Sequence, residues 1–371
     1  MKHYDAAVIG AGVFGAWTAW HLARAGKSVL LVDAWGAGHT RSSSGGETRI
    51  IRLGYGDDEI YTRMSMRSLA MWLELFKRTG QPLFHRTGVL RLSHDDDAYS
   101  VASRATLARV GAPHEVVTPD ELAGRWPQMR LPVPGTYGLF EPESGALMAR
   151  RAVAAVVDQA IAQGTDYAIQ SVTWPNPRIN AATFVFACGP WLPKLFPEIL
   201  GRRIYPTRQE VYFFAPPAGD DSFAPDRFPV WTDFTDPTGP YGFPDIEGRG
   251  IKLAFDQHGE PFDPDTDSRT VSADGVEQAR RFLGERFPVL RDAPLTEARV
   301  CQYANTSNGD FLIDHLPDDR NVWLIGGGSG HGFKHGPAIG EYAASQILRE
   351  APPEPRFSLA TKAESKQRMV Y

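Results

Sequence analysis

Residues 5–33, DAAVIGAGVFGAWTAWHLARAGKSVLLVD, decide the fold of this chain. The segment opens with a short apolar run over residues 5–9, which predicts a β-strand, and passes directly into a glycine-rich turn. Apolar side chains then recur at helical spacing until Gly26, and a second apolar run over residues 28–32 ends in Asp33. Strand, turn, helix and strand together predict a complete βαβ unit in about 30 residues.

Three glycines of this unit, Gly10, Gly12 and Gly15, are spaced as G-x-G-x-x-G. In such a motif the first glycine allows a tight turn, the second lets the backbone approach a pyrophosphate, and the third lets helix and strand pack closely. The helix then offers free N–H groups to the phosphates. Asp33 is placed to accept hydrogen bonds from ribose hydroxyls, and it disfavours a 2′-phosphate. The unit therefore predicts a dinucleotide site and leaves NAD and FAD open.

A second glycine-rich segment lies near the other end of the sequence, at residues 321–334, NVWLIGGGSGHGFK. It predicts a strand, a turn and then a helix that Pro337 opens. A nicotinamide-binding domain does not require such an element so far along the chain, whereas a larger cofactor that spans the switch point of the sheet can use one. This favours FAD, with an ordinary strand–turn–helix connection as the alternative.

Composition excludes several classes of protein. The 371 residues are enough for roughly two to three domains. The 39 Lys and Arg against 44 Asp and Glu give a net charge of -5, which disfavours non-specific nucleic-acid binding. No run of about 18 apolar residues predicts a membrane span, and the first residues lack a secretion signal, so we expect a cytoplasmic protein. Two cysteines are too few for a disulfide scaffold or a structural zinc site, and no metal is expected.

Four cationic residues lie beside the glycine-rich turns or inside apolar segments. Arg49 and Arg52 follow a Gly/Ser-rich loop, and they would share a face if their segment were helical. Lys252 interrupts the apolar strand predicted for residues 251–255, so it either faces solvent or has a function. Lys334 stands just before a helix start. Each is an ordinary surface charge by itself, and their positions beside cofactor turns favour a role in the site.

The two cysteines have different predicted roles. Cys188 ends the strand predicted for residues 183–187, where a small apolar side chain packs. Cys301 is either a buried packing residue or a thiolate that attaches covalently to a flavin ring. The periodicity of the rest of the chain predicts helices over 58–77, 150–164 and 276–287, a capped helix start at Thr118, and strands over 88–92, 211–215 and 251–255.

Seven segments carry a resemblance to a known family. Residues 10–56, from GAGVFGAW to IIRLGYG, are similar to the N-terminus of the monomeric sarcosine oxidases and N-methyltryptophan oxidases, flavoproteins of the D-amino-acid-oxidase-like superfamily. The resemblance covers nearly the whole chain in the same order. The other segments are RTGVLRL at 86–92, FEPESGAL at 140–147, YGFP at 241–244, GIKLAF at 250–255, VCQYANTSNGDFLID at 300–314 and GGGSGHGFKHGPAIGE at 326–341.

The resemblance implies an α/β FAD-binding Rossmann-like domain interleaved with an α+β substrate domain built on a mostly antiparallel sheet. The FAD domain would comprise residues 1–80, 145–200 and 300–371, and the substrate domain 81–144 and 201–299. The implied reaction oxidises the C–N bond of a secondary or tertiary amine that carries a carboxylate, and dioxygen is reduced to hydrogen peroxide. The implied partners are the small amine and dioxygen, and the implied state is a monomer.

The resemblance also implies a role for individual residues. Arg52 and Lys334 would hold the substrate carboxylate, and Tyr241 would line the substrate pocket. Arg49 and Lys252 would lie against the flavin ring, with Lys252 at the oxygen-activating position. Cys301 would attach the flavin covalently. The remaining cofactor-binding residues would be Ser43, Gly330, Gly332 and Lys334, with the glycines and acid of the βαβ unit.

Three features depart from the pattern of the family. Ser44 and Gly45 stand where its sarcosine oxidases carry a His-His pair, and Asp256 stands where they carry a pocket histidine, with His258 displaced nearby. These two differences favour a larger, cyclic or differently charged amine over sarcosine. The segment 164–183 is shorter than the corresponding β-meander of the family.

Other functions are compatible with the same motifs. A flavin-dependent amine dehydrogenase would pass electrons to a carrier, and Lys252 argues against it. A non-catalytic flavoprotein would not need Arg52, Lys252 and Lys334. A nicotinamide-dependent dehydrogenase is the alternative at the level of the fold, and an absorbance spectrum separates it from a flavoprotein.

Overall fold

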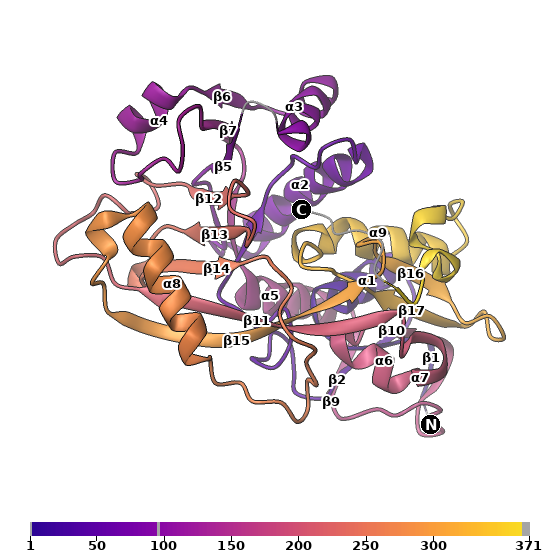
Figure 1. The fold of residues 1–371 in the computed structure, drawn as a ribbon. Helices are drawn as coiled ribbons and strands as arrows, with labels where there is room; N and C mark the ends of the chain where they lie inside the picture. The colour runs from indigo at the N-terminus through magenta and orange to yellow at the C-terminus, as the bar shows by residue number, and fades with distance from the viewer. Residues whose placement is uncertain (1, 95–96, 366–371) are drawn as a thin grey trace.

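Three β-sheets and the helices packed on them make up the computed structural model, which describes residues 2–94 and 97–365 (Figure 1). The first sheet has six strands, which are parallel except for the strand at one edge. Across the sheet they are β16 (Leu312–His315), β17 (Val322–Gly326), β10 (Asn180–Phe186), β1 (His3–Ile9), β2 (Val29–Asp33) and β9 (Asp166–Ile169).

Helices cover one face of this sheet, and alternate residues of β1 show how both faces are buried. Ala6 and Val8 pack into the core beneath the helices, whereas Ala7 and Ile9 pack into a second core on the opposite face. This is the period of two that a β-strand imposes. The helices of the first core are α1 (Val13–Arg24), α2 (Glu59–Thr79), α5 (Ala149–Ala162) and α9 (Gly336–Ile347), and the short helices α6 (Leu192–Leu195) and α7 (Pro197–Leu200) contribute to the second.

Helices α1 and α9 pack unusually closely because α9 carries glycines at the contact. A Cβ atom added to Gly336 would lie 2.4 Å from Val13, and one added to Gly340 would lie 2.5 Å from Trp17. The two glycine-rich segments of the sequence are therefore adjacent in space, each ending at the same edge of the parallel sheet (Figure 1).

The second sheet has eight strands and is mostly antiparallel, with one parallel pair, β12 and β5. In order they are β15 (Leu295–Thr306), β11 (Ile204–Phe214), β14 (Ile251–Phe255), β13 (Pro240–Phe243), β12 (Val230–Asp233), β5 (Val89–Ser93), β7 (Tyr137–Glu141) and β6 (Glu115–Val117). Helix α8 (Ala273–Arg286) packs on it, and α3 (Ala98–Val110) and α4 (Pro119–Arg125) lie at its far end (Figure 1). The predicted combination of a Rossmann-like sheet with a mostly antiparallel sheet is confirmed.

A small third sheet corrects one prediction. Its strands are β3 (Thr48–Ile51), β8 (Gly145–Met148) and β4 (Phe84–His85). The segment that carries Arg49 and approaches Arg52 is therefore a strand, so the two arginines do not share a helical face. Residues three apart on an extended chain point to opposite sides, which lets them serve two different parts of the site.

Other local predictions agree with the structure. Thr118 caps α4 by accepting a hydrogen bond from the backbone of Glu121, whose carboxylate accepts one from the backbone N–H of Thr118 in return. Across residues 2–94 and 97–365, no helix combines the length and the apolar character needed to cross a membrane.

Candidate active site

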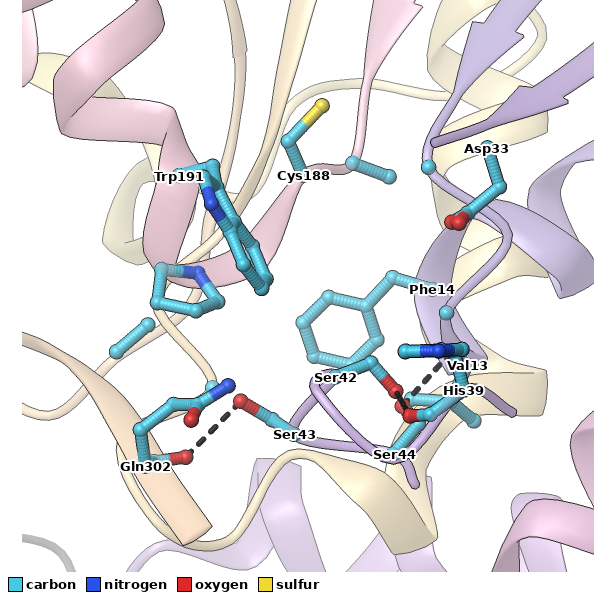
Figure 2. Close-up of a pocket in the computed structure, with 18 of the residues that line it drawn as sticks. Val13, Phe14, Asp33, His39, Ser42, Ser43, Ser44, Cys188, Trp191 and Gln302 are labelled. Atoms are coloured by element: carbon cyan, nitrogen blue, oxygen red, sulfur yellow. Dashed lines mark hydrogen bonds between the residues drawn. The ribbon is translucent and has the colours of Figure 1, made fainter. Parts of the chain in front are cut away.

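A cavity of about 480 Å³ lies where the two glycine-rich turns meet. Its wall begins at the turn after β1, passes the end of β2 and the loop of residues 39–44, and returns along β15 and the turn after β17. Figure 2 shows this arrangement, with Phe14, Asp33 and Trp191 around the same space. The carboxyl ends of parallel strands at a change of strand order are where ligands bind in such sheets.

The three glycines after β1 meet different surroundings. Gly10 has φ +102°, and a Cβ there would lie 2.5 Å from the carbonyl oxygen of Ala187. A Cβ on Gly15 would lie 1.9 Å from the carbonyl oxygen of Gly10, so this glycine is needed for packing. Gly12 is different, because its Cβ would meet nothing closer than Ser44 Oγ at 3.5 Å. Gly12 is thus open toward the cavity, as the backbone must be if a pyrophosphate is to approach it.

The N-terminus of α1 faces the cavity. Gly12, the residue before the helix, has no side chain that could cap it. Ser44 Oγ accepts a hydrogen bond from Val13 N at 3.1 Å (Figure 2). Asp33 ends β2, and its carboxylate accepts bonds from Ala11 N at 2.7 Å and from Trp35 N at 2.9 Å. Four lone-pair sites leave that carboxylate able to accept a ribose hydroxyl as well. Turn, helix end and acid therefore fit a dinucleotide such as FAD.

The second glycine-rich turn is as tightly packed as the first. Gly330 has φ +79°, and a Cβ there would lie 2.8 Å from the ring of Tyr303. A Cβ on Gly332 would lie 2.7 Å from Phe14, the residue that opens toward the cavity beside Gly12. The predicted glycines therefore shape the wall of the cavity from both turns.

Arg49, Ser43 and Cys301 meet at one end of this cavity. The Arg49 guanidinium donates through Nη2 to Ser43 O at 2.6 Å and to Cys301 Sγ at 3.5 Å. Ser43 Oγ donates to Gln302 O at 2.9 Å, which ties the loop to β15 (Figure 2). The sulfur of Cys301 therefore lies beside a guanidinium in the wall of the cavity.

Lys252 is buried, 4% exposed, so the solvent-facing alternative for it is wrong. Its Nζ donates to Thr48 O at 3.0 Å and Thr48 Oγ1 at 3.2 Å, and it lies 4.2 Å from the ring centroid of Phe243. Burial, together with the nearby charge of Arg49, holds the pKa of Lys252 well below that of a surface lysine. β14 therefore presents this amine to the β3 end of the site.

Arg52 and Lys334 converge on Tyr55. The Lys334 ammonium is 5% exposed and donates to Tyr55 Oη at 2.8 Å and to His331 O at 3.1 Å. The Arg52 guanidinium lies 4.4 Å from the centroid of the Tyr55 ring and donates to the carbonyl of Gly54. Burial and the charge of Arg52 lower the pKa of Lys334. Two cations from segments far apart in the sequence thus lie against the same tyrosine.

Asp256, Tyr303 and Tyr241 lie near one another and near these cations. Tyr303 Oη donates to Asp256 Oδ1 at 2.9 Å, and burial, together with Tyr241 and Asp256, raises the pKa of Tyr303. Burial raises the pKa of Asp256, while Tyr303, Arg52 and Lys334 act in the opposite direction. Burial also raises the pKa of Tyr241, to about 12, so its hydroxyl stays protonated at neutral pH. Tyr241 is close enough to feel the charges of both Asp256 and Arg49.

The site also contains residues that sequence reasoning missed. Tyr55 and Tyr303 stand inside segments that resemble the family, but a tyrosine in a strand or turn is typical of the core, so neither was assigned to the site. Trp191 stands outside every motif. His331 accompanies Lys334, and burial lowers its pKa to about 3, so it is neutral. Cys188 lines the cavity, as Figure 2 shows, and donates to Ile9 O at 3.3 Å; burial raises the pKa of its thiol, which agrees with a packing role.

Comparison with known proteins agrees with this geometry. The model of the family described as "DAO: FAD dependent oxidoreductase" matches residues 5–346. The monomeric sarcosine oxidase of Bacillus sp. (strain B-0618) is 33% identical over 365 residues, covering 93% of this chain and 92% of that protein. The N-methyl-L-tryptophan oxidase of Salmonella arizonae is 32% identical over 370 residues, covering 94% and 96%.

Among solved structures, the L-proline dehydrogenase of P. horikoshii is 20% identical and superposes with a TM-score of 0.83, covering 96% of this chain and 97% of that one. This similarity shows that the two chains share a fold. The family match extends over nearly the whole chain, and the two curated relatives exceed 30% identity over most of it. The chain belongs to the DAO family of FAD-dependent oxidoreductases.

Proposed function

We propose that this protein oxidises the C–N bond of a small amine that carries a carboxylate, producing an imine and, from dioxygen, hydrogen peroxide. The main support is the convergence of Arg52 and Lys334 on Tyr55, since Lys334 directly follows Phe333, which lines the cofactor cavity. Within residues 2–94 and 97–365, neither the buried Lys334 nor the half-buried Arg52 forms an ion pair with a carboxylate, so both can pair with an anion of the ligand. We infer that the substrate is an amine because the relatives are named as oxidases of sarcosine and N-methyl-L-tryptophan.

The cations perform two tasks in this proposal. Each charge-assisted hydrogen bond from Arg52 or Lys334 to the substrate carboxylate contributes on the order of 1.5–3 kcal/mol. A substrate that is held by its carboxylate presents the carbon next to its nitrogen to the cofactor in one orientation. The same positive charges lower the pKa of the substrate amine and so assist loss of the ammonium proton that must precede oxidation. FAD, when bound, supplies the two-electron oxidant.

Lys252 and Arg49 serve the other half of the reaction. Dioxygen gains negative charge as it is reduced, and a preorganised cation in a dry site stabilises that charge. Among the residues that the structure describes, the buried Lys252 ammonium donates to Thr48 alone, so its third N–H is available for such an anion. Arg49 donates to Cys301 Sγ at 3.5 Å, and we propose that Cys301 attaches FAD covalently because it lines the cofactor cavity.

Anaerobic titration of the purified yellow protein tests the proposal. Carboxylated primary, secondary and cyclic amines are added while the flavin absorbance band is followed, and peroxide is measured after air is admitted. We expect at least one such amine to bleach the band and one peroxide to form per bleached flavin. A band that no carboxylated amine bleaches refutes amine oxidation, and bleaching without peroxide on aeration points to a dehydrogenase with an electron carrier.

Three further expectations belong to the same proposal. We propose that residues 1–80, 145–200 and 300–371 bind FAD, whereas 81–144 and 201–299 form the substrate domain. The "monomeric" relatives support a monomer. A cytoplasmic location stays a prediction from the sequence.

A further inference from the structure

One buried carboxylate, Glu141, bonds to the loop that carries Arg52. It ends β7 in the second sheet and is 5% exposed. Its Oε2 accepts hydrogen bonds from Leu53 N at 2.6 Å and from Ser144 Oγ at 2.6 Å, and its Oε1 accepts one from Gly54 N at 2.9 Å. A carboxylate that is removed from water needs a cation or several hydrogen bonds of this kind. Two successive backbone amides of one loop supply most of them here.

No cation explains the burial of Glu141. None of the ion pairs formed among residues 2–94 and 97–365 includes this carboxylate. Its three donors are neutral, and two of them belong to the connection between β3 and α2. The bonds of Glu141 therefore fix the backbone of that connection, which comes from the other half of the molecule.

The same connection determines how Arg52 is held. The guanidinium of Arg52 folds back along the chain, where Nη1 donates to Gly54 O, and it lies 4.4 Å from the ring centroid of Tyr55. Three successive peptide units are thus fixed: Glu141 binds the N–H groups of two, and Arg52 binds the carbonyl of the third. Tyr55 follows directly and accepts a hydrogen bond from Lys334 at 2.8 Å. Glu141 therefore supports the backbone that lies between Arg52 and Tyr55.

We propose that Glu141 is a positioning residue, which holds the N–H groups of Leu53 and Gly54 and thereby sets the guanidinium of Arg52 in the orientation that binds the substrate carboxylate. This inference rests on the proposed function, which gives Arg52 a carboxylate to bind. Glu141 itself contacts no substrate in this assignment. Because it acts through Arg52, its contribution to carboxylate affinity requires that Arg52 be present.

Replacement of Glu141 by glutamine keeps the shape of the side chain and removes an acceptor. The carboxylate turns one oxygen toward each of two backbone N–H groups, whereas an amide has one oxygen and one NH₂ group. In either orientation of the amide, its NH₂ group faces a backbone N–H, and one of the two bonds is lost. The backbone at residues 53–54 is then released and the guanidinium of Arg52 shifts with it. Loss of one charge-assisted bond to the ligand corresponds to about tenfold weaker carboxylate binding.

A double-mutant cycle on the FAD-loaded protein tests this assignment. The probe is sodium acetate, which replaces sodium chloride at constant ionic strength while the flavin absorbance spectrum is followed. Arg52→Met and Glu141→Gln should each weaken acetate binding about tenfold or more. In the Arg52→Met background Glu141→Gln should have no further effect, because the residue through which it acts is absent. A further loss of the same size in that background, or unchanged affinity in Glu141→Gln alone, would overturn the inference.

Asp233→Asn is the matched control. Asp233 is also a fully buried carboxylate of the second sheet, but it pairs with Arg286 at 2.5 Å and makes no contact with the Arg52 loop among the described residues. This variant should lose stability and keep its affinity for acetate. If it weakens acetate binding as much as Glu141→Gln does, the effect reflects a general loss of stability and the inference is wrong.

Gly54→Ala approaches the same contact from the other side. Its methyl would lie 3.1 Å from Glu141 Oε1, so it should displace the carboxylate and weaken acetate binding roughly threefold or more. Should Glu141→Gln not fold, judged by circular dichroism, this variant decides the matter, and unchanged acetate affinity in it contradicts the role of Glu141.

The cycle also separates the inference from the function on which it rests. If Arg52→Met leaves acetate affinity unchanged, Arg52 binds no carboxylate, and the proposed function loses its main support together with the inference. If Arg52→Met weakens acetate binding but Glu141→Gln does not, the function stands and the role of Glu141 fails. If the cycle behaves as expected while no amine bleaches the flavin, the proposed oxidation fails and the role of Glu141 in carboxylate binding stands.

Discussion

Replacing Gly12 by alanine separates the ligand-binding role of the first glycine-rich turn from its packing role. The added methyl would lie 3.5 Å from Ser44 Oγ, with nothing closer, and φ is -72°, which alanine adopts without strain. Alanine is a poorer N-cap than glycine, which destabilises the fold, but it also lowers the entropy of the unfolded chain, which stabilises the fold. Because the two effects oppose each other, the free energy of unfolding of the apoprotein should change by less than about 1 kcal/mol.

Binding of FAD should respond quite differently. The methyl occupies the space that a pyrophosphate needs, and one lost charge-assisted hydrogen bond of about 1.5–3 kcal/mol corresponds to roughly 10- to 150-fold weaker binding. The measurement is a fluorescence titration of apoprotein with FAD. It is made in a Cys301→Ser background, so that binding is reversible even if the unmodified protein attaches its flavin covalently.

Two further glycines provide the controls. Gly15→Ala places a methyl 1.9 Å from the Gly10 carbonyl oxygen and should destabilise the apoprotein itself, by about 3 kcal/mol or more. Gly124→Ala, exposed in α4 with nothing within 4 Å of the new methyl, should stabilise it by about 0.5–1 kcal/mol and leave FAD affinity unchanged. If Gly12→Ala binds FAD as well as its parent, or destabilises the apoprotein as Gly15→Ala does, the reasoning is refuted.

Four other predictions follow from the same structure. Lys252→Met should slow reoxidation by dioxygen at least a hundredfold while flavin reduction by substrate keeps its rate; stopped-flow measurement of both half-reactions checks this, and equal effects on both would remove the role in oxygen activation. Acid precipitation of the unmodified protein should leave yellow colour in the pellet and that of Cys301→Ser should release it, so a colourless first pellet rules out covalent attachment. Arg286→Met should cost about 3–5 kcal/mol in urea unfolding, because it strips the fully buried Asp233 carboxylate of an ion pair 2.5 Å long, and the double variant with Asp233→Asn should recover part of the loss. Burial lowers the pKa of His21 to about 4 from 6.5, so the free energy of unfolding is highest above pH 6.5 and falls by about 2–3 kcal/mol as the pH is lowered to 4. His21→Phe should flatten this part of the plot of unfolding free energy against pH. An unchanged slope would contradict the assignment.

Much of the cofactor half of the molecule could be read from the sequence. The βαβ unit is local, so its alternation, its glycines and the acid after the second strand all appear within one short stretch. The capped start of α4 at Thr118 is similarly local, since the cap and its partner Glu121 are three residues apart. In both cases the residues that specify the structure are also the residues that contact one another.

The substrate half depended on contacts between distant segments. Lys252 could face solvent or the interior by sequence alone, and only the packing of β14 against Thr48 buries it. Arg52 and Lys334 are separated by most of the chain, and Tyr55 brings them together. Asp256 stands at the position of a pocket histidine of the family, and only the structure shows that it pairs with Tyr303. Periodicity reports which face of an element is buried but carries no information about what lies opposite, so the chemistry of this pocket was decided by tertiary structure.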